Sequence, residues 1–376
     1  MIPYGRQSID EDDIRAVVEV LRSDWLTTGP AVDHFEKAMA ELAGTKYAVA
    51  VSSGTAALHA IMYAIDIGPG NEVIVPTMTF ASTANAVVFQ GGKPVFTDVT
   101  AETLLLAPAA IEEKITSRTK AVIAVDYAGQ PCDYDALRAV TDRHGLILLA
   151  DACHALGAAY RGKPTGALGE LTAFSFHPVK HVTTGEGGMV TTNNEEYDRR
   201  MRRFRNHCIT TDHRQRAEQG SWFYEMVDLG YNYRITDMQC ALGKSQLKKL
   251  SRWIEKRQMI AKRYDEAIRE ISWCRPLRLR DDVTHAYHLY VIRLAEDFSL
   301  AQQEVFSRMR AEGIGVNVHY IPVHLHPYYR RHFATTAGQC PIAEAAYQHI
   351  LSLPMYPGLS AEDQQQVIEV MRGIGT

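Results

Sequence analysis

The sequence predicts an α/β protein in which a mostly parallel central sheet is flanked by helices and followed by a smaller C-terminal α+β domain. Two observations support this prediction. Through residues 47–150, short apolar runs typical of buried strands alternate with amphipathic segments of helical period. A long Lys/Arg-rich segment at residues 236–271 then precedes a shorter region of mixed helix and strand. Repeated strand–helix units with short connections favour parallel strands covered by helices on both faces.

The large domain is expected to begin with a helix after Ser8, which we predict to be its N-terminal cap, because three acidic residues follow at the positive end of the helix. Further helices are expected at residues 32–42, 55–65, 82–89 and 134–144. Strands are expected at residues 47–51, 72–75, 94–98, 121–125 and 146–150.

The C-terminal region is expected to start with one long helix, or two joined end to end, at residues 236–271. A strand is expected at residues 288–293, and helices at residues 300–309 and 343–351. We therefore predict a large domain at residues 1–250 and a small domain at residues 251–376, and the N-terminal segment is a candidate to pack on the small domain.

Composition excludes several classes of protein. The formal net charge of −4 over 376 residues provides no basic patch for nucleic acid. No apolar stretch is long enough for a membrane span, and the N-terminus has no hydrophobic signal core. The six cysteines are scattered without a CxxC pair, so we expect reduced thiols and a cytoplasmic protein.

Lys180 is the residue around which we interpret the chemistry. It ends the apolar stretch 174–180, and a Gly-rich loop follows it at residues 184–188. Upstream, Asp151 comes directly after the apolar run 146–150, at the expected carboxyl end of a strand. A lysine that forms a Schiff base and a carboxylate that keeps a pyridine nitrogen protonated are what a pyridoxal 5′-phosphate (PLP) site requires. Taken singly, a surface lysine and a helix-capping aspartate are the commoner interpretations.

A phosphate site is expected where the strand 47–51 meets the next helix. The amides at a helix N-terminus, with the hydroxyls of Ser53 and Thr55, form a cradle for a dianionic phosphate, although the same residues often serve only as a cap and a tight turn. Ser175 adds a second hydroxyl. Phe80 is a candidate to stack on the ring, the alternative being a core phenylalanine. His154 is a candidate to face the ring edge, the alternative being a helix-start histidine.

Taken together, these residues resemble the DegT/StrS nucleotide-sugar aminotransferases, which are PLP enzymes of the aspartate aminotransferase fold (fold type I). The resemblance covers almost the whole chain and also draws on residues 230–234 and 319–324. Within the family, the sequence is most similar to the enzymes that aminate C4 of a UDP-linked 4-keto-6-deoxy-N-acetylhexosamine in pseudaminic acid biosynthesis. That similarity is carried by residues 7–10, 23–27 and 239–243.

The resemblance implies a role for each matching residue. Lys180 would carry the cofactor and move the substrate proton, and Asp151 would pair with the pyridinium nitrogen. L-glutamate would be the amino donor, and a lysine rather than a histidine at position 180 favours transamination over dehydration. The other implied cofactor contacts are His154 near the phenolic oxygen, Phe80 on the ring, Gly54, Thr55 and Ser175 on the phosphate, and Asn232 reaching the phosphate of the neighbouring subunit in a homodimer with shared active sites.

Two further stretches have competing interpretations. The loop at residues 319–326 is rich in histidine, but it lacks cysteine or carboxylate ligands at zinc spacing, so we expect no metal and favour contact with the sugar nucleotide. From their positions, the candidate substrate contacts are His319, Tyr320, His324 and Arg234. The basic stretch 201–205 could meet a diphosphate or nucleic acid, but we favour the solvated face of a helix beginning near Glu195.

Three rival functions stay open at this point. The substrate could be another keto-sugar, such as a UDP-4-keto-pentose or a dTDP-linked keto-6-deoxyhexose. The chain could also be a non-catalytic regulator that retains the fold, although the intact set of Lys180, Asp151 and Ser175 argues against this. A nucleic-acid-binding regulator lacks support, because Tyr4 already lies inside the family pattern and leaves no spare N-terminal segment.

Overall fold

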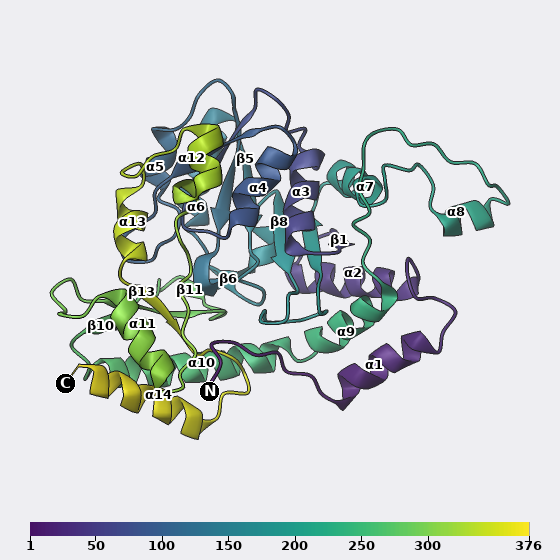
Figure 1. Ribbon diagram of the computed structural model, residues 1–376. Coiled ribbons are helices and arrows are strands. Elements are labelled where there is room, and N and C mark those ends of the chain that lie inside the picture. The colour runs from purple at the N-terminus through teal and green to yellow at the C-terminus, as the bar shows by residue number, and fades with distance from the viewer. Residues whose placement is uncertain (376) are drawn as a thin grey trace.

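The protein is described by a computed structural model that covers residues 1–375, and its centre is a seven-stranded sheet (Figure 1). The strand order is β1-β9-β8-β5-β4-β2-β3. The strands are β1 (Tyr47–Val51), β2 (Glu72–Pro76), β3 (Lys93–Thr97), β4 (Thr119–Val125), β5 (Ile147–Asp151), β8 (Leu171–Ser175) and β9 (Gly188–Thr192). Strand β9 pairs antiparallel with both of its neighbours, and the other pairs are parallel. The predicted mostly parallel sheet is therefore confirmed.

Helices flank this sheet and bury its apolar strands. The central strands β2, β4 and β5 are almost entirely buried, as expected for parallel strands covered on both faces. The helices of this part are α1 (Glu11–Leu21), α2 (Pro30–Ala43), α3 (Gly54–Ala64), α4 (Ala81–Phe89), α5 (Pro108–Glu112), α6 (Tyr134–His144), α7 (Glu195–Phe204) and α8 (His213–Glu218).

The C-terminal region begins with two helices joined end to end, α9 (Asp237–Leu247) and α10 (Leu250–Ile268), as one of the two sequence alternatives predicted. Helix α9 begins with a capping box between Thr236 and Gln239. A three-stranded antiparallel sheet follows, in the order β10-β12-β13. The remaining elements are β10 (Cys274–Pro276), β11 (Val283–Thr284), β12 (Tyr290–Leu294), α11 (Gln302–Ala311), α12 (Pro327–Phe333), α13 (Pro341–Tyr347), β13 (Ile350–Leu353) and α14 (Ala361–Ile374), with β6 (Ala159–Tyr160) and β7 (Lys163–Pro164) in a small sheet with β11.

The N-terminus lies beside this C-terminal region (Figure 1). The backbone of Ile2 bonds to Gly313 and Gly315, and its side chain joins the apolar cluster of α10, α11 and α14. The apolar residues of α12 and α13, by contrast, pack into the core of the large sheet. The domain division at residue 250 stays a prediction.

Two local predictions were wrong. Asp10, not Ser8, caps α1, because its carboxylate accepts from the amides of Asp12 and Asp13 and so satisfies two free donors at once. The helix expected at residues 343–351 ends at Tyr347, and residues from Ile350 form strand β13 instead. Pairing with β12 supplies this segment with backbone partners and overrides its helical period.

The segment between α7 and α9 extends away from the sheet and carries α8 (Figure 1). This projecting segment, residues 206–235, exposes an unusual number of large apolar side chains, and Trp222 is 84 % exposed. The others are Phe223, Tyr224, Met226, Val227, Leu229 and Tyr231. Large apolar side chains gathered in one exposed segment are typical of interaction surfaces.

Candidate active site

The predicted phosphate loop lies between β1 and α3. Ser53 is the N-cap of α3, and its hydroxyl accepts from the amide of Ala56 at 3.1 Å. Its carbonyl accepts from Ala57. Among residues 1–375, no acceptor bonds to the amides of Gly54 and Thr55, so two donors at the positive end of α3 are free for an anion.

A glycine packs closely against other residues on each side of this loop. A Cβ at Gly54 would lie 3.0 Å from Cβ and 3.3 Å from Oγ of Ser175, and 3.3 Å from Sγ of Cys153. A Cβ at Gly188, the first residue of β9, would lie only 2.3 Å from the carbonyl oxygen of Ser53. The phosphate loop, Ser175 and the residues after Asp151 are therefore packed against one another with no room for a side chain between them.

Asp151 is the last residue of β5 and is 6 % exposed. Its Oδ2 accepts from the hydroxyl of Thr83 at 2.7 Å, and its Oδ1 accepts from the amide of Cys153 at 3.2 Å. Two donors thus fix the orientation of a buried carboxylate at the carboxyl end of a parallel strand, which is where ligands bind in open α/β sheets.

Lys180 lies in the loop that joins β8 to β9, five residues beyond the end of β8, so the apolar stretch 174–180 continues past the strand into this loop. A turn closed by its amide and the carbonyl of His177 holds it there. Its Nζ lies 3.2 Å from Nε2 of His288. Burial lowers the pKa of Lys180 to about 8, and the nearby Cys153 and Asp151 oppose this effect. An amine with a lowered pKa is more often neutral, which a nucleophile requires.

His154 faces the same space from the other side. Its Nε2 lies 2.9 Å from the hydroxyl of Tyr320, and its ring centroid lies 4.4 Å from that of His288. Burial and the charge of Lys180 lower the pKa of His154, so its imidazole is neutral. Its Nδ1 is buried and has no hydrogen-bond partner in the described chain. A buried polar atom without a partner at this position is free to bind a ligand.

Phe80 precedes α4 and is 57 % exposed, so the alternative of a core phenylalanine is wrong. Its ring is tilted against that of Tyr320, with the centroids 5.9 Å apart. An exposed aromatic side chain beside the site is available for stacking.

The structure brings most of the predicted cofactor residues into one continuous group. Contacts link Gly54 to Ser175 and Cys153, and Asp151 to Cys153. Lys180 is linked through His288 and His154 to Tyr320, and it lies near enough to Cys153 and Asp151 for their charges to raise its pKa. His319 lies next to Tyr320; its Nδ1 is 2.8 Å from Oγ of Ser352, and burial lowers its pKa to about 4.

Three predicted residues lie outside this group. His324 is fully buried, and its two ring nitrogens bond to Thr77 and Glu344, so the prediction that it contacts substrate is wrong. Asn232 and Arg234 lie on the projecting segment, and the guanidinium of Arg234 donates to Oδ1 of Asn206 at 2.8 Å. Within a single chain, neither of them contacts Lys180.

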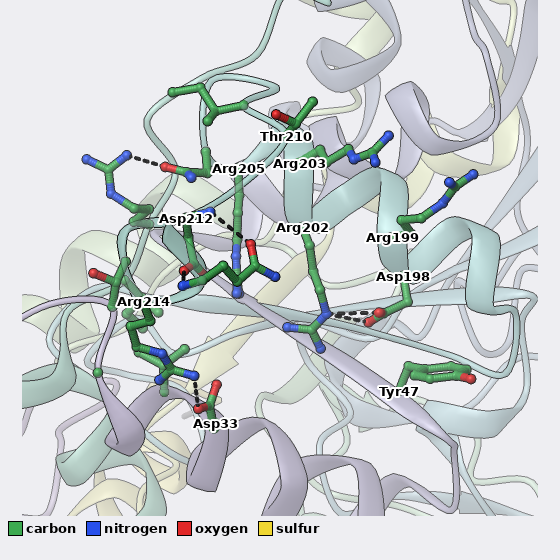
Figure 2. Close-up of a pocket in the computed structure, with 18 of the residues that line it drawn as sticks. Asp33, Tyr47, Asp198, Arg199, Arg202, Arg203, Arg205, Thr210, Asp212 and Arg214 are labelled. Atoms are coloured by element: carbon green, nitrogen blue, oxygen red, sulfur yellow. Dashed lines mark hydrogen bonds and ion pairs between the residues drawn. The ribbon is translucent and has the colours of Figure 1, made fainter. Parts of the chain in front are cut away.

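Arg234 instead lines a basic cavity of about 550 Å³ between α2 and α7 (Figure 2). The expectation that residues 201–205 form a solvated helix face is wrong for Arg202 and Arg205. Arg202 and Arg205 both pair with the buried Glu36, and Arg202 also pairs with Asp198. Burial raises the pKa of Glu36, but the charges of Arg205 and Arg202 outweigh burial and hold it below its ordinary value.

Sequence reasoning missed His288 and Thr83. Both are buried and contact the predicted catalytic residues directly. The only signal for His288 was a histidine two residues before the apolar strand β12, a position that many core histidines share. Thr83 lies inside a small-residue helix with nothing in its neighbours to single it out.

Residues 1–375 contain no group of three or more histidine, cysteine, aspartate or glutamate side chains that could hold a metal ion. Of the helices described there, none has the length and apolar character to cross a membrane.

The residues present fit PLP. A glycine cradle with free amides and a serine hydroxyl suits its phosphate, a buried carboxylate suits its pyridinium nitrogen, and the unpartnered Nδ1 of His154 provides a polar contact beside a lysine of lowered pKa. The fold and this site together define a PLP-dependent aminotransferase.

Comparison with known proteins identifies the family: residues 7–372 match the DegT/DnrJ/EryC1/StrS aminotransferase family, and the chain belongs to it. It is 42 % identical over 376 residues to the spore coat polysaccharide biosynthesis protein SpsC of Bacillus subtilis, covering 99 % of this chain and 97 % of SpsC. Among solved structures it is similar to the putative sugar aminotransferase Spr1654 of Streptococcus pneumoniae in its PMP form (TM-score 0.94, 32 % identity, 100 % and 99 % of the two chains). It is also similar to Helicobacter pylori PseC, an aminotransferase involved in the biosynthesis of pseudaminic acid (TM-score 0.92, 32 % identity, 100 % and 99 % of the two chains).

These findings confirm the PLP-dependent transferase fold, PLP as cofactor and sugar amination as the activity. They exclude the non-catalytic regulator among the rivals.

Proposed function

We propose that this sugar aminotransferase transfers the amino group of L-glutamate to C4 of a UDP-linked 4-keto-6-deoxy-N-acetylhexosamine, for a surface glycan of the pseudaminic acid type. The observation that carries the proposal is the similarity to PseC along the whole chain. The residue patterns at positions 7–10, 23–27 and 239–243 support it.

In this proposal each site residue has a separate role in binding the cofactor or in moving a proton. PLP, when bound, supplies an electron sink for the carbanion that forms when the substrate loses a proton. Lys180 would hold the cofactor and serve as the base that accepts and returns that proton, a task for which a pKa of about 8 is well matched. Asp151 keeps the ring nitrogen protonated, while Gly54, Thr55 and Ser175 hold the phosphate, with Ser53, Phe80 and His154 completing the cofactor contacts.

For the sugar nucleotide, we assign His319 and Tyr320 as contacts, since the hydroxyl of Tyr320 bonds to His154 and the ring of His319 packs edge-on against that of Tyr320. Arg234 is assigned to the substrate of the neighbouring subunit, because it shares the projecting segment with Asn232.

The proposal includes a homodimer with shared active sites. Asn232 is exposed and follows the exposed apolar side chains of the projecting segment, of which Trp222 is the most exposed. A second copy that covers this segment would bury those side chains and receive Asn232 at its phosphate site. Chains carrying Lys180→Ala and Asn232→Ala should each be inactive alone and regain activity when mixed, because one site of each mixed dimer is then intact. Two inactive variants that stay inactive on mixing would contradict sharing.

We also assign the enzyme to the cytoplasm. The structure contains six free cysteines, five of them buried, and this supports a reducing compartment. Fractionation of the native cells, with the enzyme followed by antibody, tests the assignment.

The substrate is tested by half-reactions. The pyridoxamine form of the enzyme is mixed with UDP- and dTDP-linked keto-sugars, and return of the yellow PLP form is followed by absorbance. Return with the UDP-linked 4-keto-6-deoxy-N-acetylhexosamine alone supports the proposal. The alternative substrate is a different nucleotide-linked keto-sugar, such as a UDP-4-keto-pentose or a dTDP-keto-6-deoxyhexose. Return with one of these alone would replace the proposed substrate.

A further inference from the structure

We propose that His288 is a positioning residue that holds the amine of Lys180 in the orientation from which it bonds to the cofactor. The proposal rests on the role of Lys180 given above. Nε2 of His288 lies 3.2 Å from Nζ of Lys180, although the two residues are 108 positions apart in the sequence. Among residues 1–375, no other side chain forms a hydrogen bond with this amine.

The backbone around His288 is fixed from two sides. The amides of Ala286 and Leu289 donate to the carbonyls of Gly129 and Ala128 in the large domain. Gly129 has a φ of +103°, and a Cβ there would lie 2.9 Å from the amide nitrogen of Tyr287 and 3.0 Å from that of His288. Only glycine permits both this conformation and this approach. The segment 285–289 is thus pressed against the loop after β4.

A buried arginine completes the support. Arg257 on α10 is 1 % exposed, and its Nη1 donates to the carbonyls of Tyr287 and Met355 at 2.9 Å and lies 3.4 Å from that of His288. A guanidinium without a carboxylate partner is costly to bury, so its use to bind backbone carbonyls at this place indicates that the position of the segment matters.

The chemistry of the imidazole suits this task. Burial and the charge of Lys180 lower the pKa of His288, so the ring is neutral and presents one acceptor and one donor nitrogen. The other groups that act on the amine are Asp151, Cys153 and Arg257. Nε2 of His288 bonds to the amine without adding charge, and fixes its direction while leaving it free to lose a proton. Nδ1 is buried without a partner in the described residues, so the bond to Lys180 is the one polar contact that the ring makes.

The rival explanation is that His288 only fills space, since its ring also packs against those of His154 and His181. Removal of the ring would then weaken cofactor binding as a whole. A positioning role predicts a narrower effect: slower formation of the covalent bond between Lys180 and PLP, with unchanged affinity for a PLP analogue that lacks the aldehyde.

The test compares three variants of the full-length apo-enzyme. His288→Leu removes the hydrogen bond, and His288→Gln keeps a polar group at the place of Nε2. His285→Leu is the matched control, since His285 is also buried on this segment but bonds to the amide of Tyr287 and not to Lys180. Two quantities are measured: the dissociation constant of pyridoxine 5′-phosphate by calorimetry, and the rate of covalent PLP attachment by absorbance, with borohydride trapping and mass spectrometry to identify the lysine.

For His288→Leu we expect attachment to slow about tenfold, the factor that one hydrogen bond of ordinary strength contributes. Affinity for pyridoxine 5′-phosphate should stay within about twofold, a change below the energy of one hydrogen bond. His288→Gln should restore most of the rate, and His285→Leu should retain it. An unchanged rate in His288→Leu, or a parallel loss of rate and analogue affinity in both leucine variants, would overturn the inference. If PLP still attaches covalently in Lys180→Ala, both the proposed role of Lys180 and this inference are overturned. If attachment is lost in Lys180→Ala but its rate is unchanged in His288→Leu, this inference alone is overturned.

Discussion

Substitution of Gly54 by alanine isolates the phosphate cradle from the rest of the site. The new Cβ would lie 3.0 Å from Cβ of Ser175 and 3.3 Å from its Oγ, which forces the hydroxyl and the loop apart by a few tenths of an ångström. Overpacking of this kind costs about 1–3 kcal/mol. Alanine in place of glycine stabilises a helix by about 1 kcal/mol, which offsets part of this cost. The free energy of unfolding should therefore fall by only about 1 kcal/mol.

The effect of Gly54→Ala on phosphate binding should be much larger. A hydrogen bond to a charged group contributes about 1.5–3 kcal/mol, so misplacement of one donor predicts an affinity for pyridoxine 5′-phosphate about 10–100-fold lower. Calorimetry measures this affinity, and thermal unfolding measures the stability. Gly68→Ala is the matched control, because a Cβ there meets nothing within 4 Å. Analogue affinity in Gly54→Ala equal to that of the wild type would refute the placement of the phosphate.

Three further predictions follow from single contacts. Glu36→Gln leaves two arginines without their buried partner and should lower the free energy of unfolding by about 2 kcal/mol, a value reduced to allow for the partial exposure of Arg202. Because the folded pKa of Glu36 lies below its ordinary 4.5, this loss of stability is present at neutral pH and should disappear as pH falls through that lowered pKa. Thermal unfolding at several pH values measures it. Thr83→Val removes a donor from Asp151 and should lower kcat several-fold while costing about 1 kcal/mol of stability, measured by steady-state assays and thermal unfolding. Phe80→Ala should weaken cofactor binding by about 1 kcal/mol with an unchanged Tm, since the ring is exposed; calorimetry with pyridoxine 5′-phosphate measures the loss, and equal affinity would contradict stacking.

The parts of the site that the sequence predicted are those set by local order along the chain. A carboxylate at the end of an apolar run, such as Asp151, must lie at the carboxyl edge of the sheet once the run is a parallel strand. The turn before α3 is similar, because Ser53 and Gly54 have the local geometry of a helix start wherever the helix is placed. Short-range rules are sufficient for such residues.

The parts that the sequence did not predict depend on contacts between distant segments. His288 reaches Lys180 only because the segment before β12 packs against the loop after β4, and no local pattern encodes that contact. The same is true of Glu36 on α2. It is buried against Arg202 of α7 and Arg205 at the end of α7, in a stretch that the sequence suggested was solvated. His324 illustrates the converse: a position in a histidine-rich loop suggested substrate contact, but packing against Thr77 and Glu344 uses both of its nitrogens.

The antiparallel strand β9 explains why these separate pieces meet at one edge. In a fully parallel sheet, the chain after β8 would have to cross to the opposite edge before the next strand could begin. Because β9 runs antiparallel to β8, the loop between them starts and ends at the carboxyl edge, and Lys180 stays beside Asp151. The first residue of β9, Gly188, then lies directly against the carbonyl of Ser53. One reversal of strand direction therefore places the lysine loop, the carboxylate and the phosphate loop within reach of a single cofactor.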